Sequence, residues 1–75
     1  MYRDRYAVIL VYGTSHAIRA ESLLHQAGMA SKMIPVPRHL SSNCGVCVRI
    51  ERTDVEAARQ VLDKGRLEIE AIHEI

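Results

Sequence analysis

The chain has 75 residues, of which 48% are hydrophobic, so it can form one small domain with a single core. A formal net charge of +1 and an aromatic set limited to three tyrosines give no reason to expect nucleic acid as a partner. No stretch is long and apolar enough to span a membrane, and the N-terminal segment lacks a signal-peptide cleavage site. These features predict one cytoplasmic domain over residues 1–75, without nucleic acid or membrane as a partner.

The first third of the chain predicts a buried strand followed by an amphipathic helix. Residues 5–12 form a continuous run of β-branched and aliphatic side chains, which is typical of a strand buried on both faces. Thr14 or Ser15 then suits the N-cap of a helix. Gly28 suits the left-handed position just beyond the C-terminus of that helix.

The rest of the chain predicts two strands, a helix and a last strand. Residues 32–37 read as a short strand, which two prolines confine to a sheet edge. A polar loop over 38–43 leads to an alternating strand at 45–51. The sequence TDVE at 53–56 is a capping box that opens a helix, and a glycine at 65 ends it. Residues 67–75 form the final strand.

This order of elements predicts an α+β fold, the ferredoxin-like βαββαβ plait, with a four-stranded antiparallel sheet and two helices on one face. The second and fourth strands are then the edges of the sheet, so the prolines fall where they remove the fewest hydrogen bonds. The first strand is apolar on both faces, and its face away from the helices needs cover. A second copy, in a homodimer through the open sheet face, or another protein would supply it.

The stretch SSNCGVCVR, residues 41–49, holds both cysteines of the chain. Four interpretations are open: a redox pair, half of a metal site, one reactive thiol with a neighbour, or two apolar residues of a strand. Three steps along a strand span about 10 Å, which exceeds the roughly 4.4–6.8 Å between the Cα atoms of a disulfide. Zinc needs four ligands, and one chain offers two thiols with His39 or His73 as distant candidates, whereas two chains together could form a four-thiolate site. We therefore predict no metal and no cofactor, with Cys44 as the reactive thiol and Cys47 as a packed residue or second thiol.

The plait also predicts the surroundings of Cys44. The start of the third strand lies at the end of the sheet where the first helix begins, so Cys44 should face the positive end of that helix. Four possible cations, His16, Arg38, His39 and Arg66, are expected at the same end. Such surroundings lower the pKa of a cysteine from about 8.5 toward neutrality.

The motif IPVPRHLSSNCGVCVRI resembles the signature of the Se/S carrier protein-like family, and the similarity spans about residues 6–62. The matching positions are Ala17, Glu21, Leu24, Gly28, Pro35, Pro37, Arg38, Ser41, Ser42, Cys44, Gly45 and Arg49. The resemblance implies a carrier in which a single cysteine holds sulfur or selenium as a persulfide or selenosulfide. The chain departs from the family pattern at Cys47, where a small aliphatic residue is expected.

The sequence thus favours a sulfur or selenium carrier rather than a stand-alone enzyme. Cys44 would hold the transferred atom, and Arg38, Ser41, Ser42 and Gly45 would bind it. Donor and acceptor proteins would be the partners. Two alternatives stay open: a non-catalytic binding or regulatory module that uses the open sheet face, and a thiol- or metal-linked dimer through Cys44 and Cys47.

Overall fold

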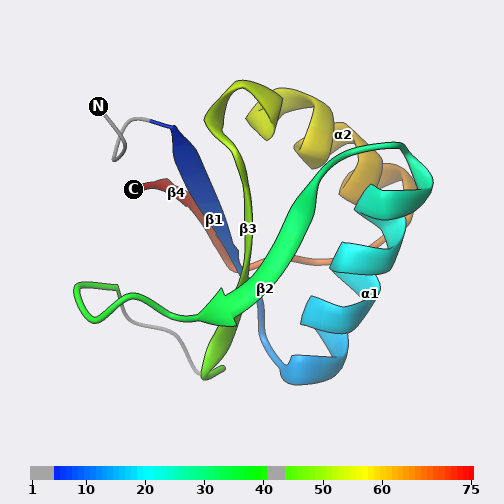
Figure 1. Ribbon diagram of the computed structural model, residues 1–75. Coiled ribbons are helices and arrows are strands. Elements are labelled where there is room, and N and C mark those ends of the chain that lie inside the picture. The colour runs from blue at the N-terminus through cyan, green and yellow to red at the C-terminus, as the bar shows by residue number, and fades with distance from the viewer. Residues whose placement is uncertain (1–4, 41–43) are drawn as a thin grey trace.

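The computed structural model describes residues 5–40 and 44–75 and contains the six expected elements (Figure 1). Their bounds are β1 Tyr6–Leu10, α1 Thr14–Gln26, β2 Ser31–Pro35, β3 Val46–Glu51, α2 Val55–Lys64 and β4 Ala71–Glu74, with a 3-10 turn, η2, at Arg52–Asp54. Within the described ranges, no helix has the length and apolar character needed to cross a membrane. The predicted order of elements is confirmed.

The four strands form one antiparallel sheet in the order β2-β3-β1-β4. Both helices lie on one side of this sheet, and residues 36–40, which follow β2, extend toward the other side (Figure 1). β2 and β4 are the edges, as predicted, and Pro35 is the last paired residue of β2, opposite Val46. The fold is therefore the predicted ferredoxin-like plait.

The main core lies between the sheet and the helices. Side chains alternate along each strand, so Ile9 of β1 and Val48 of β3, which are paired, both point toward the helices. The small residues Ala17 and Ala20 of α1 and Ala58 of α2 let the helices approach the sheet closely. The buried members of this helix-side core are Ala7, Ile9, Val11, Ala17, Ala20, Leu24, Cys44, Val48, Ile50, Ala58, Leu62 and Leu67.

A second, smaller core lies on the opposite face of the sheet. It contains Val8, Leu10 and Cys47, none of which is more than 2% exposed. The chain itself supplies the cover: Ile34, Val36, Leu40, Ala71 and Ile75 pack against these three residues. The prediction that β1 is apolar on both faces is confirmed, but burying this open-face core requires no second copy.

The two helices begin differently from the predicted caps. Gly13, in extended backbone, is the N-cap of α1, and it accepts the first helical hydrogen bond from Ala17 N–H at 3.1 Å. Thr14 is therefore already helical. α2 is preceded by η2, and its N-cap, Asp54, makes no side-chain capping hydrogen bond. The predicted capping box at Thr53 is wrong because the 3-10 turn delays the start of α2 to Val55.

Both helices end in the same backbone motif, which closes with a left-handed residue. In α1 this residue is Gly28, at φ +78°, as predicted. In α2 it is Arg66, at φ +56°, while Gly65 keeps right-handed backbone. Gly65 has another reason to be glycine, because a Cβ there would lie 2.7 Å from Leu23 Cδ1 of α1. Close contact between the helices thus requires glycine at position 65, and the left-handed position that follows is occupied by Arg66.

We expect Arg66→Gly to stabilise the protein. Left-handed backbone costs a non-glycine residue about 1–2 kcal/mol, while the freedom of glycine in the unfolded chain costs about 0.5–1 kcal/mol. The net gain in the free energy of unfolding should be about 0.5 kcal/mol, measured by urea denaturation.

The matched control is Gly28→Ala, which should destabilise by a similar amount because no atom lies within 4 Å of the added Cβ and only the backbone is strained. Thr53→Ala should leave the free energy of unfolding unchanged within about 0.5 kcal/mol, since Thr53 is exposed and caps no helix. If Arg66→Gly and Gly28→Ala changed stability in the same direction, the positive φ angles would not be the cause.

Candidate functional site

Cys44 lies just before β3, at the end of the sheet where α1 begins. Its side chain belongs to the helix-side core and is only 6% exposed. The Sγ atom lies 3.9 Å from Thr14 Oγ1, within hydrogen-bonding distance for sulfur. Residues 30 positions apart in the sequence thus meet at this point, which confirms the predicted approach of Cys44 to the first turn of α1.

The local structure of α1 makes Thr14 available for this contact. Because Gly13 is the N-cap, the Thr14 hydroxyl makes no capping hydrogen bond and can reach the sulfur. The first turn of a helix carries a partial positive charge from its unpaired N–H groups, which stabilises a nearby anion. A thiolate at Cys44 would accept a hydrogen bond from Thr14 and lie at this positive end.

Two exposed hydrophobic side chains flank the first turn of α1 in the sequence. Tyr12, two residues before Thr14, is 51% exposed, and Ile18, one helical turn after it, is 57% exposed. These two are the exposed large hydrophobic residues in the part of the chain that the structure describes. They lie on either side of Thr14 along the chain, and Thr14 is the residue whose hydroxyl contacts Cys44.

Cys47 lies on the opposite face of the sheet from Cys44. It is fully buried in the open-face core, and its thiol donates to the carbonyl oxygen of Pro35 at 3.9 Å. Burial, together with the nearby charge of Cys44, raises the pKa of the Cys47 thiol to about 11. The packed role predicted for Cys47 agrees with this environment.

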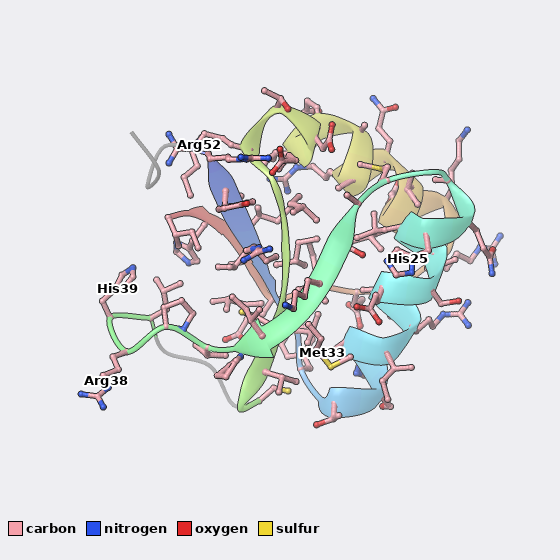
Figure 2. The ribbon with its side chains drawn as sticks, in the orientation of Figure 1. His25, Met33, Arg38, His39 and Arg52 are labelled. Carbon is pink, nitrogen blue, oxygen red and sulfur yellow. The ribbon has the colours of Figure 1, made fainter. Side chains whose placement is uncertain are left out.

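Of the four predicted cations, Arg38, His39 and Arg66 do not lie around Cys44. Arg38 and His39 are exposed at the outer end of the β2–β3 connection, and Figure 2 shows both side chains pointing away from α1. This part of the connection extends toward the open face of the sheet, whereas Cys44 faces the helices. The α2–β4 turn that contains Arg66 contacts the middle of α1, where Arg19 Nη2 donates to the carbonyl oxygen of Gly65 at 3.3 Å. The expected electrostatic clamp by Arg38 is therefore not formed.

The structure describes two of the remaining predicted residues, His16 and Gly45. His16, in the first turn of α1, is half-buried, and its Nδ1 has no hydrogen-bond partner among the described residues. Gly45 follows Cys44 directly, and its carbonyl oxygen accepts a hydrogen bond from Val36 N–H at 3.2 Å. Ser41 and Ser42 lie outside the described residues. Thr14 is the additional residue that the structure places beside Cys44. The sequence pattern indicates Thr14 only as a possible helix cap.

The geometry gives no support to a site that uses both cysteines. Their side chains belong to separate cores on opposite faces of the sheet, and neither cysteine is in a disulfide. Across residues 5–40 and 44–75, no group of three or more histidine, cysteine and acidic side chains is placed to hold a metal ion. Of the interpretations of the cysteine motif, the structure favours one thiol at a helix start and one packed thiol.

We expect Cys47 to be the slower thiol toward alkylation in the folded protein. With a pKa of about 11, only about 0.1% of Cys47 is thiolate at pH 8, and the side chain is fully buried. In a Cys44→Ser variant, iodoacetamide labelling of Cys47 should be slow and should accelerate as the pH approaches 11. Mass spectrometry would follow the labelling, with urea-unfolded protein as the control.

The burial of Cys47 also makes the free energy of unfolding depend on pH. A thiol whose pKa is higher in the folded state than in the unfolded state contributes stability below about pH 9, which is lost as the pH rises toward 11. A Cys47→Ala variant should lose less stability than the parent protein across this range. Equal losses in both proteins, or fast labelling of Cys47 at neutral pH, would contradict the buried environment.

Comparison with known proteins agrees with the motif around Cys44. No curated protein and no solved structure matches the chain. One family model, described as "Putative Se/S carrier protein-like", matches residues 6–74, which include every strand and helix of the fold. The chain therefore belongs to the Se/S carrier protein-like family.

Proposed function

We propose that this domain carries a sulfur or selenium atom on Cys44 and delivers it to an acceptor enzyme. The observation that carries the proposal is the position of Cys44 Sγ, 3.9 Å from Thr14 Oγ1 at the positive end of α1. Membership of the Se/S carrier protein-like family supports the same role. A reducing cytoplasm would keep both cysteines as thiols, and neither is in a disulfide in the structure.

Loading would proceed by transfer of one atom between two sulfurs. The Cys44 thiol loses its proton, and the thiolate attacks the terminal sulfur of a donor protein's persulfide. A new S–S bond forms on Cys44 while the donor's S–S bond breaks, and its electron pair leaves with the donor as a thiolate. The product is a Cys44 persulfide, and no external oxidant or reductant is consumed. A terminal selenium atom would give a selenosulfide by the same exchange.

Thr14 would act as the group that positions and stabilises this anion. Its hydroxyl can donate to the thiolate before transfer, and it lies at the helix end that favours negative charge throughout the exchange. The loop residues Ser41, Ser42 and the Gly45 amide would assist in holding the outer atom. Arg38 points outward, away from α1, so it would not contact the transferred atom in this arrangement.

The low exposure of Cys44 implies that the donor must touch the carrier closely. Cys44 is only 6% exposed, so a donor would have to come very close to reach its sulfur. Tyr12 and Ile18 would provide apolar contact there and exclude water from the exchanging sulfurs. Such contact would bring the donor's persulfide close to Thr14 and Cys44.

The test is loading from a persulfide. Incubation with glutathione persulfide should add one sulfur atom to the wild-type chain, detected by intact-mass spectrometry without reductant. Cys44→Ser should abolish the addition, and Cys47→Ala should retain most of it. Thr14→Val, which is nearly isosteric, should slow loading by about tenfold because one charge-assisted hydrogen bond is lost.

The matched control for Thr14→Val is Ser15→Ala, which removes an exposed hydroxyl from the next residue of α1. Circular dichroism would show that each variant keeps its fold. Sulfur addition to Cys44→Ser at the wild-type rate would refute the proposal. Equal rates for Thr14→Val and the wild type would remove Thr14 from the mechanism while leaving the carrier role in place.

A further inference from the structure

The part of the open sheet face beyond the small core is basic. Lys32 of β2 pairs directly with Arg49 of β3, so two cations face each other across neighbouring strands. Directly opposed like charges destabilise a sheet. Neither side chain forms an ion pair within the described part of the chain. Their charge is therefore not balanced locally.

The side chain of Arg49 is held in a fixed position. Its guanidinium lies over the ring of Tyr6, with Cζ 4.2 Å from the ring centroid. Arg5 lies 5.3 Å from the same centroid, and its Nε is 3.2 Å from Glu51 Oε1. Stacking fixes the plane of a guanidinium but leaves its N–H edge free for a carboxylate. Of the three cations here, Arg5 alone is paired with an acid.

These residues surround a hollow of about 370 Å³. It is lined by Arg5, Tyr6, Ser31, Lys32, Arg49 and Glu51, together with Ala30 and Ile50. The hollow lies at the end of β3 opposite to Cys44, which immediately precedes that strand, so a molecule bound in it would leave the thiol accessible. A concave surface with two uncompensated cations and a stacked arginine has the features of a site for carboxylates.

The possible occupants can be compared by their charge. A second copy docked face to face would bring two basic surfaces together, and the apolar part of this face is already covered by the chain. A nucleic acid would need a longer basic track than one hollow on a chain of formal net charge +1. Carboxylates on a protein segment match both the size and the charge of the hollow.

We propose that the open sheet face is a docking site for an acidic segment of a partner protein, with carboxylates bound between Lys32 and Arg49. This site is separate from the chemistry at Cys44 and does not depend on it. The stacked Arg49 supplies directional hydrogen bonds, and the exposed Lys32 supplies additional charge. The apolar side chain of Val8, which pairs with Arg49 on the other side, limits the basic surface toward β1.

The probe is a fluorescein-labelled oligoglutamate peptide titrated with the full chain, with binding followed by anisotropy at low salt. Lys32→Glu and Arg49→Gln should each weaken binding by about tenfold. The matched control is Lys64→Glu, which makes the same charge change at an exposed position on α2 and should change binding by less than about twofold. NMR amide shifts should concentrate on β2 and β3 and confirm that each variant is folded.

Three outcomes would overturn the proposal. Equal weakening by Lys64→Glu and Lys32→Glu would show a general charge effect without a site. Tighter binding of a single-stranded oligonucleotide at the same residues would assign the face to nucleic acid. A homodimer in sedimentation analysis that dissociates on Lys32→Glu substitution would assign it to a second copy. Cys44→Ser should bind the peptide like the wild type, which separates this test from the carrier chemistry.

Discussion

The alternation of side chains along β3 is the constraint on which both candidate surfaces depend. β3 is a central strand, paired with β2 on one side and β1 on the other, so its register fixes which residues face the helices. Val48 and Ile50 thereby enter the helix-side core, while Cys47 and Arg49 face the other way. A slip of one residue would place a guanidinium among the helices and expose the core, so the buried face specifies the pairing strongly.

The sequence was sufficient for the architecture but not for every contact of the site. Hydrophobic periodicity and the edge prolines predicted the order of strands and helices, and topology alone brought Cys44 to the start of α1. The N-caps of both helices were mispredicted, because the backbone begins α1 after the extended Gly13 and places a 3-10 turn before α2. The position of Arg38 was not predicted correctly. It depends on the packing of Val36 and Leu40 against the sheet, which strand periodicity does not encode.

The candidate thiol site and the basic surface lie on different parts of the domain. The thiol end combines a helix terminus, one hydroxyl and two exposed apolar side chains, whereas the opposite end of the other face combines cations and a stacked aromatic ring. A small plait can support both because its sheet isolates the two sets of residues from each other. The same separation explains how a chain with almost no net charge can still have a locally basic face.

The location of the two sulfurs on opposite faces of the sheet has a consequence for the lifetime of a loaded carrier. A persulfide is vulnerable to any thiol in the same molecule that can attack its inner sulfur, because closure of an internal disulfide expels hydrosulfide. Here the second thiol is protonated, fully buried and separated from the first by the backbone of β3. If Cys44 carries a persulfide as proposed, the chain would not discharge itself without local unfolding, and the cargo would remain in place until an outside thiol removed it.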